Sequence, residues 1–218
     1  MKVLEELKVK NVIISKQAED SENFQKFKQI VNKRKIPVII VESKAFANSK
    51  KQNNNSIKNV DIICKEKIQI EKNIYFDFLW PDNQNLLNEN ALNNNSIVAK
   101  LHYNNFSCFF TGDIEEIAEK QILQEYKDNL YVLSSTVLKT AHHGSKTSSI
   151  QDFIEAVKPK ISLIGVGENN KFGHPNDDVI SRLENIGSKI YRTDKMGEIS
   201  IMVNSQGKIK IKKHIKCN

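Results

Sequence analysis

Three short segments of the chain combine carboxylate or imidazole side chains with glycine, and these residue types bind metals and move protons. In the first segment, Asp113 ends the tripeptide Thr111-Gly112-Asp113 directly after an apolar run. A carboxylate placed where a buried strand ends and a helix begins is typical of sites in α/β proteins. The same position also suits an aspartate that caps the helix, because its oxygens can accept backbone N–H bonds. Both interpretations of Asp113 stay open at this point.

The second segment is Leu138–Ser145, in which the paired histidines His142 and His143 follow an apolar run and precede Gly144. Neutral imidazole is a common ligand for zinc and similar metals. Adjacent residues of a strand point to opposite faces, so at most one imidazole enters a site unless Gly144 bends the chain. The alternative is one histidine in the core and the other in solvent.

The third segment is the polar loop at residues 170–175, where His174 stands just before a predicted helix. A single histidine in a loop is usually only solvated, so this segment is a weak signal by itself. The turn at residues 192–197 has the composition of an ordinary turn between strands. His102 and His214 lie in alternating strand-like segments, and we interpret both as structural.

Length and composition limit the class of protein that these segments can belong to. The 218 residues suit one domain, and 39% hydrophobic with 27% charged residues excludes wholesale disorder and a fibrous repeat. The formal net charge of +7 favours anionic partners without deciding between DNA, a phosphorylated small molecule and a merely solvated basic face.

Cysteine count and hydropathy give no sign of secretion. The 3 cysteines are an odd number and are widely spaced, so a disulfide framework is not expected. Apolar runs such as Val38–Val41 fall far short of the about 20 residues that a membrane helix needs. Charged residues follow Met1, where a signal peptide would have an apolar core. The chain by itself is therefore cytoplasmic by default.

Hydrophobic periodicity predicts an α/β protein with a polar, exposed loop at residues 48–59. Helical spacing occurs at Met1–Lys8, between Ser21 and Pro37, and at Ile114–Tyr126, Ile150–Val157 and Asn176–Ile186. Strand patterns occur at Val12–Ile14, Val38–Val41, Val60–Cys64, Ile68–Ile70, Ile74–Leu79, Ser96–Tyr103, Phe106–Thr111, Ile161–Val166, Lys189–Arg192, Glu198–Val203 and Lys208–Ile215. In the 114–126 helix, Ile114, Ile117, Ala118, Gln121 and Ile122 predict packing on one side only.

The motifs taken together resemble a known family. They are N-N-N-S-I-V at Asn93–Val98, F-F-T-G-D at Phe109–Asp113, L-K-T-A-H-H-G-S at Leu138–Ser145, G-H-P at Gly173–Pro175 and Y-R-T-D at Tyr191–Asp194. In this order they resemble the metallo-β-lactamase-fold domain at the C-terminal end of ComEC-type DNA-internalisation competence proteins, and its stand-alone relatives. The resemblance implies one domain over residues 1–218, an αββα sandwich with one or two divalent metal ions, zinc or manganese, between its sheets.

The resemblance also implies roles for particular residues. Asp113 corresponds to the family's T-G-D aspartate, and His142 or His143 corresponds to the histidine of its H-H-G-S motif. In this family a carboxylate can bridge two metals and help to make hydroxide available near neutral pH. The metal ligands would be Asp113, one of the paired histidines and Asn93. Lys139, Ser145 and His174 would surround the phosphate of the substrate, with Asp113 and His143 completing the catalytic set.

One motif of the family has no counterpart here, because no histidine precedes His102. The family's first metal motif has the form H-x-D-x-D-H followed by glycines. We therefore expect Met1 to correspond to an internal methionine and the fold to lack its first strands and first metal motif. Because two or three ligands hold a metal weakly, we expect this chain to bind catalytic metal poorly and to hydrolyse little.

The expected function is that of a ComEC-like, metal-dependent hydrolase of phosphodiesters, with DNA as its partner and a link to DNA uptake. One alternative is a stand-alone hydrolase of a small phosphoester or another ester. Another is an inactive fragment that binds nucleic acid or a protein. Within a ComEC-type membrane protein, the domain would be extracytoplasmic.

Overall fold

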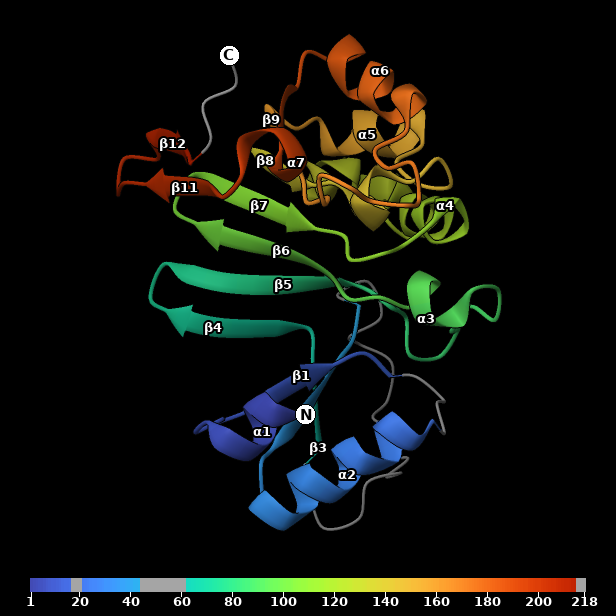
Figure 1. Ribbon diagram of the computed structural model, residues 1–218, viewed down its shortest axis with the longest axis vertical. Helices are drawn as coiled ribbons and strands as arrows, with labels where there is room; N and C mark the ends of the chain where they lie inside the picture. Colours follow the sequence, from blue (N-terminus) through green and yellow to red (C-terminus); the bar gives the residue numbers. More distant parts are fainter. Residues whose placement is uncertain (17–20, 44–61, 215–218) are drawn as a thin grey trace.

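The computed structural model describes residues 1–16, 21–43 and 62–214, and helices alternate with strands along much of this length (Figure 1). The predicted α/β class is confirmed. The polar loop expected at residues 48–59 lies outside the described residues. Among the residues that are described, no helix is long and apolar enough to cross a membrane.

A seven-stranded mixed sheet with the order β10-β9-β8-β7-β6-β5-β4 forms the centre of the molecule. Its strands are β4 (Lys67–Glu71), β5 (Ile74–Trp80), β6 (Val98–Tyr103), β7 (Phe106–Phe110), β8 (Val137–Lys139), β9 (Ile161–Ile164) and β10 (Lys189–Arg192). Strands β4 to β7 are antiparallel, and Asn104 turns the β6–β7 hairpin with a left-handed φ of 49°. Strands β7 to β10 are parallel, so their carboxyl ends meet at one edge of the sheet.

Helices cover one face of this sheet (Figure 1). They are α4 (Glu116–Glu125), α5 (Gln151–Val157) and α6 (Asp177–Asn185), and the 3-10 segment η2 (Lys127–Leu133) precedes β8. Phe109, Leu138 and Ile164 of the sheet are fully buried against Ile122 and Phe153 of the helices. Their burial supplies much of the apolar stabilisation of the domain.

Helix α4 packs on one side, as its pattern predicts, although not with every residue of the predicted stripe. Ala118 and Ile122 are fully buried, whereas Ile117 is 37% exposed. The buried side includes Glu119, whose carboxylate accepts bonds from the backbone N–H groups of Ser149 (2.6 Å) and Ile150 (2.8 Å) at the start of α5. Burial raises the pKa of Glu119 to about 7. A polar residue thus joins two helices at a position that hydropathy alone assigns to solvent.

The N-terminal part of the chain forms a smaller unit beyond β4 (Figure 1). It contains α1 (Lys2–Glu6), β1 (Val12–Ile14), α2 (Glu22–Arg34), β2 (Val38–Val41) and β3 (Ile62–Lys65). The three strands form a parallel sheet of order β1-β2-β3. Ser21 caps α2, since its hydroxyl accepts a bond from the Phe24 N–H at 3.2 Å. Val41 of β2 packs against Phe78 and Ala99 of the central sheet.

A hairpin of β11 (Ile199–Val203) and β12 (Ile209–Lys213) covers the face of the central sheet that lies opposite the helices. Alternation along the strands separates the faces, because Cys108 and Val137 face the hairpin while their neighbours Phe109 and Leu138 face the helices. Cys108 is a free, buried thiol, and burial raises its pKa to about 12. The helices and the hairpin thus cover opposite faces of the central sheet.

Candidate functional site

The carboxyl ends of the parallel strands bring the predicted segments together. The Thr111-Gly112-Asp113 segment follows β7, the paired histidines follow β8, and Gly165 follows β9. The Thr111 hydroxyl donates to the Lys139 carbonyl at 2.7 Å and so ties the ends of β7 and β8 to each other. Segments that are about 30 residues apart in the sequence therefore share one edge of the sheet, as expected for an α/β site.

Gly112 lets the chain turn closely past its neighbours after β7. Its φ is +57°, and an added Cβ would lie 2.7 Å from the Cβ of Ser96. The Ser96 hydroxyl accepts a bond from the Asp113 N–H at 3.3 Å, and the Gly112 carbonyl accepts one from the His142 N–H at 3.0 Å. The tight turn thus sets the position of Asp113 and links it to the histidine segment.

The paired histidines do not continue a strand, so the strand alternation used to predict their directions does not apply. β8 ends at Lys139, and the 3-10 segment η3 (Ala141–Gly144) contains three successive left-handed residues. The φ values are 43° at His142, 56° at His143 and 81° at Gly144. Such values are strained for residues with a Cβ, and surrounding contacts must hold them. Both imidazoles consequently remain near the same site.

His143 lies beside Asp113, which confirms the predicted proximity of these motifs. Its Nδ1 is 2.6 Å from the Gly165 carbonyl oxygen. A carbonyl can only accept a hydrogen bond, so Nδ1 carries the proton and Nε2 of the neutral ring keeps a free lone pair. This Nε2 lies 3.8 Å from Oδ1 of Asp113, with both side chains about half exposed. The pair offers a basic nitrogen and a carboxylate to solvent.

A second histidine and carboxylate lie next to this pair. Nδ1 of His142 is 3.4 Å from Oε1 of Glu115, and it is a buried atom without a hydrogen-bond partner. Glu115 is the N-cap residue of α4, and its oxygens accept bonds from Thr147 (3.0 Å) and Asn90 (2.7 Å). Glu115 was not among the site residues predicted from the sequence. The available signal was a second acidic residue two positions after Asp113.

His174 is the third imidazole of the site. Its ring centroid lies 5.8 Å from that of His142, whose own centroid lies 6.4 Å from that of His143. The Asn170 side chain holds the His174 backbone, since it accepts the His174 N–H at 2.9 Å and donates to the His174 carbonyl at 2.7 Å. Partial burial, and then the charges of His142 and His143, lower the pKa of His174.

Lys139 is the last residue of β8 and lies close enough to Asp113 to interact with its charge. Its ammonium donates to the Thr140 carbonyl at 2.9 Å. Burial lowers the pKa of Lys139, and the nearby negative charge of Asp113 opposes that shift. Lys139 thus places a partly buried cation within the electrostatic reach of Asp113.

Two other predicted site residues have local contacts instead. Ser145 is buried, and its hydroxyl pairs with that of Thr147 at 3.0 Å. Asn93 lies within α3 (Ala91–Asn94). Its neighbour Asn94 is the asparagine that reaches this region, because its side-chain oxygen accepts a bond from the Glu115 N–H at 2.9 Å. Ser145 and Asn94 thereby connect to the site through residues adjacent to it.

The remaining residues singled out in the sequence lie in other contacts. Arg192 forms an ion pair with Asp194, its Nε donating at 3.0 Å, just after β10. His102 stacks on Tyr75 within the central sheet, with ring centroids 4.5 Å apart. His214 follows β12, and its Nε2 lies 3.6 Å from Oε1 of Glu198. These three residues take no part in the cluster around Asp113.

The potential metal ligands of the site form two separate pairs, His143 with Asp113 and His142 with Glu115. Among the described residues, no group of three or more histidine, cysteine, aspartate and glutamate side chains gathers closely enough to hold a metal ion. A catalytic zinc site usually has three protein ligands and an open position. The described side chains therefore do not fit a catalytic metal ion by themselves.

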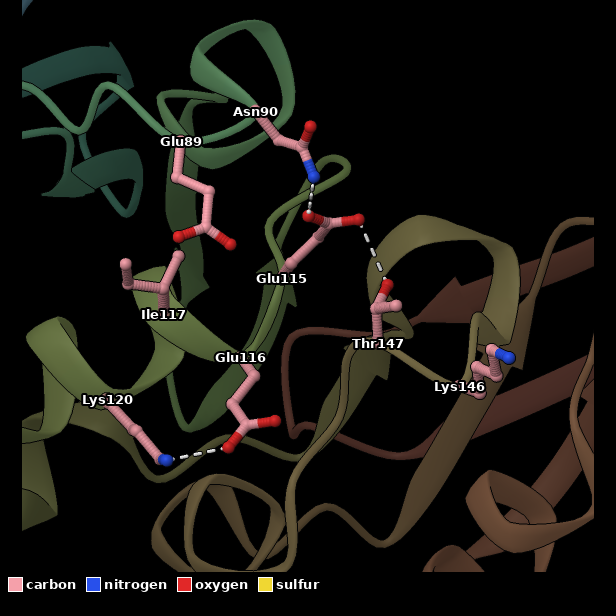
Figure 2. Close-up of a pocket in the computed structure, with 8 residues that line it drawn as sticks. All are labelled: Glu89, Asn90, Glu115, Glu116, Ile117, Lys120, Lys146 and Thr147. Carbon is pink, nitrogen blue, oxygen red and sulfur yellow. Dashed lines mark hydrogen bonds and ion pairs between the residues drawn. The ribbon is translucent and has the colours of Figure 1, made fainter.

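A pocket of about 510 Å³ adjoins Glu115 on the side of α4. Figure 2 shows Glu115 between Asn90 and Thr147, with Glu116 paired to Lys120 farther along the wall. The complete lining consists of Glu89, Asn90, Glu115, Glu116, Ile117, Lys120, Lys146 and Thr147. This volume suits a small molecule.

The chain is similar in sequence to short segments of two competence proteins. No protein-family model matches the chain. It is 31% identical over 128 residues to "ComE operon protein 3" of Bacillus subtilis, which is 59% of this chain and 16% of that protein. It is 31% identical over 144 residues to "Competence protein ComA" of Neisseria gonorrhoeae, which is 66% of this chain and 20% of that protein.

Among solved structures, the metallo-β-lactamase fold protein YhfI of Bacillus subtilis aligns with a TM-score of 0.43 and 10% identity, over 87% of this chain and 75% of that one. The alignments with the competence proteins span only 16% and 20% of those proteins. The chain is nevertheless homologous to the aligned segment of each competence protein, and the resemblance of its motifs to ComEC-type competence proteins is confirmed.

Proposed function

We propose that this chain is a ComEC-like hydrolase domain of the metallo-β-lactamase superfamily that acts on the phosphodiester backbone of DNA during DNA uptake. The observation that carries the proposal is the His143–Asp113 pair at the ends of adjacent parallel strands, with Nε2 of His143 3.8 Å from Oδ1 of Asp113. Sequence kinship with two competence proteins supports the link to DNA uptake.

The pair has the chemistry that hydrolysis requires. Because Nδ1 of His143 donates to the Gly165 carbonyl, the lone pair on Nε2 can accept a proton from a water molecule whose oxygen attacks phosphorus. The bond between phosphorus and the leaving nucleoside oxygen breaks, and that oxygen takes a proton from solvent. Asp113 then stabilises the imidazolium that forms, since opposite charges at this distance attract each other. Lys139 supplies positive charge close to Asp113, where a phosphate oxygen would gain negative charge.

The proposed mechanism does not depend on zinc or manganese, and we include these ions only as additions in the experiments. The described side chains provide two histidine–carboxylate pairs and no group of three ligands. A metal bound by Asp113 and His143 would need further ligands from solvent, substrate or other residues. We therefore assign proton transfer to the side chains and derive no step from a metal.

Hydrolysis of a fluorophore-labelled oligonucleotide by the full chain tests the proposal, with Zn²⁺, Mn²⁺ or EDTA present in parallel reactions. We expect turnover that falls about 100-fold or more in Asp113→Asn and His143→Gln, the usual loss for a general base or its charge partner. His214→Gln is the matched control, because His214 lies beyond β12, outside the cluster. Turnover that is unchanged in the first two variants would refute the assignment.

A second candidate is DNA binding without hydrolysis. The absence of a three-ligand group among the described residues favours it, because a catalytic ion needs such a group. Turnover of the labelled oligonucleotide separates the candidates, and isothermal titration with Zn²⁺ and Mn²⁺ shows whether an added ion contributes: turnover, with or without metal uptake, supports the hydrolase. DNA binding without metal uptake or turnover supports the binding domain.

A small phosphoester is the alternative substrate, and the pocket beside Glu115 is the observation that favours it. The pocket has the size of a small-molecule site, but three glutamates and two lysines line it. Turnover of a small phosphodiester reporter that Lys146→Ala impairs, with DNA hydrolysis intact, would support the small substrate.

A further inference from the structure

An exposed aromatic ring stands at the edge of the candidate site. Phe172 is 81% exposed at the tip of the 167–175 loop, which joins β9 to α6. Its ring lies nearly parallel to that of His174, at an interplanar angle of 18° and with centroids 6.0 Å apart. His174 in turn lies next to His142, so a row of rings leads from the exposed tip to the histidine pair.

The loop holds this ring outward in a defined position. Asn170 bonds both the N–H and the carbonyl of His174 through its side chain, and its backbone N–H donates to the Gly167 carbonyl at 3.2 Å. At the other end of the loop, Pro175 packs on Gly144 of the histidine segment. An added Cβ on Gly173 would meet nothing within 4 Å, so the side of the loop at Gly173 is open. Phe172 is thus held beside an open surface.

A flat ring with an open face and a neighbouring cation matches the way in which proteins bind unpaired bases. Bases of single strands stack on aromatic side chains, whereas base faces inside a duplex are already covered by their neighbours. Lys171 is exposed beside Phe172 and can attract the backbone phosphate of the same nucleotide. A lone exposed aromatic residue would need no explanation, but the row of rings connects this one to the site.

We infer that Phe172 is a stacking platform for a base of single-stranded DNA, which positions the neighbouring phosphodiester at the histidine–carboxylate cluster. The inference rests on the proposed action on DNA and adds to it a preference for unpaired strands. Phe172 acts here as a positioning residue, since it contacts the base and not the reacting phosphorus.

Binding measured by fluorescence anisotropy in EDTA tests the inference without hydrolysis. The probes are a labelled single-stranded 15-mer, the same sequence in a duplex with hairpin-closed ends, and single strands in which an abasic site is moved from position to position. We expect the unaltered chain to bind the single strand more tightly than the duplex. Phe172→Ala should raise the Kd for the single strand about 5- to 150-fold, the usual effect of losing one stacked base, and leave duplex binding nearly unchanged.

Two further variants separate stacking from other effects. Phe172→Trp should restore tight binding because it keeps a flat ring. Tyr131→Ala is the matched control: Tyr131 is 84% exposed but lies in η2, which leads into the opposite end of β8, and its loss should leave the Kd unchanged. When the abasic site lies at the position whose base would stack on Phe172, the strand should bind the unaltered chain and Phe172→Ala with the same Kd. The salt dependence of single-strand binding should not change, since no phosphate contact is lost.

The inference is overturned if the unaltered chain binds no single strand, if Phe172→Ala and the unaltered chain bind it equally, or if both DNA forms lose affinity to the same extent. Circular dichroism confirms that each variant is folded, as expected for a change at an exposed loop tip. Phe172-dependent binding without hydrolysis would contradict the proposed hydrolase and leave the platform intact. Hydrolysis without Phe172-dependent binding would leave the proposed hydrolase intact and overturn the stacking platform.

Discussion

Replacing Gly144 with alanine should destabilise the protein more than the same change at another glycine of similar backbone conformation. Gly144 has φ +81°, and an added Cβ would lie 2.7 Å from the Cβ and 3.2 Å from the Cα of Pro175. Gly187, which follows α6, has φ +78°, but an added Cβ there would meet nothing within 4 Å. The two glycines therefore share a conformational cost and differ in steric contact.

The expected free energies follow from these two effects. A left-handed conformation costs an alanine about 1–2 kcal/mol relative to glycine. Forcing an extra methyl group against a neighbour costs about 1–3 kcal/mol more, because side chain and backbone must shift. Gly187→Ala should thus lower the free energy of unfolding by about 1–2 kcal/mol, and Gly144→Ala by about 2–5 kcal/mol.

Urea unfolding followed by circular dichroism measures both values, with equal m-values as the check that the denatured states are comparable. The site provides a second measurement. Pro175 follows His174 directly, so Gly144→Ala should also displace the 167–175 loop and weaken single-strand binding, whereas Gly187→Ala should leave it intact. Equal destabilisation by the two variants, within about 0.5 kcal/mol, would refute the steric argument.

Three further predictions concern stability away from the site. Because the pKa of Glu119 is raised from 4.5 to about 7, the folded state binds its proton more tightly than the unfolded state, so the free energy of unfolding should fall by at most about 3 kcal/mol as pH rises from 4.5 to 7. Glu119→Gln should flatten this part of the urea-unfolding pH profile. An unchanged slope in Glu119→Gln would show that another group causes the pH dependence. In a chain whose other two cysteines are serine, Cys108 should react with a maleimide only on unfolding, since its thiol is buried with a pKa of about 12; rapid labelling of the folded protein, measured by mass spectrometry, would show that the strand opens. Ser21→Ala should lower the free energy of unfolding by about 1 kcal/mol through loss of the α2 cap, whereas Ser21→Asp should retain it, as thermal melts can measure.

The positions of the strands, and of Asp113 after one of them, were predictable because burial imposes a simple pattern of apolar residues on a strand. Val38–Val41 and Lys189–Arg192 have the predicted bounds as strands, since continuous apolar or alternating residues allow little else. The position of Asp113 at a strand end was likewise predictable from the apolar run that precedes it. What periodicity could not give is the pairing of β7 with β8, which places Asp113 beside His143. That pairing is a contact between distant segments.

Other parts of the site depend on contacts that leave no periodic signal. Glu115 resembles any acidic residue in the first turn of a helix, and only the folded chain shows it beside His142. Asn170 and Phe172 belong to a polar loop whose conformation depends on two side-chain bonds to one residue. Away from the site, the burial of Glu119 is equally invisible to periodicity, because it depends on two backbone N–H groups at the start of α5 that hold the carboxylate inside the protein.

The direction of the two imidazoles follows the exception that the sequence left open, a bend of the chain in the histidine–glycine segment, and the reason is conformational. Strand alternation sends neighbouring side chains to opposite faces, but three successive left-handed residues reverse the chain so that His142 and His143 stay near one another. Such a turn is strained at both histidines, so contacts from outside must hold it. The Gly112 carbonyl binds the His142 N–H, the Gly165 carbonyl binds the His143 ring, and Pro175 packs on Gly144. One contact comes from the segment after β7, and two come from the connection between β9 and α6. The geometry of the site is therefore a property of the whole sheet edge, and a change in any one of these segments should alter both stability and DNA binding.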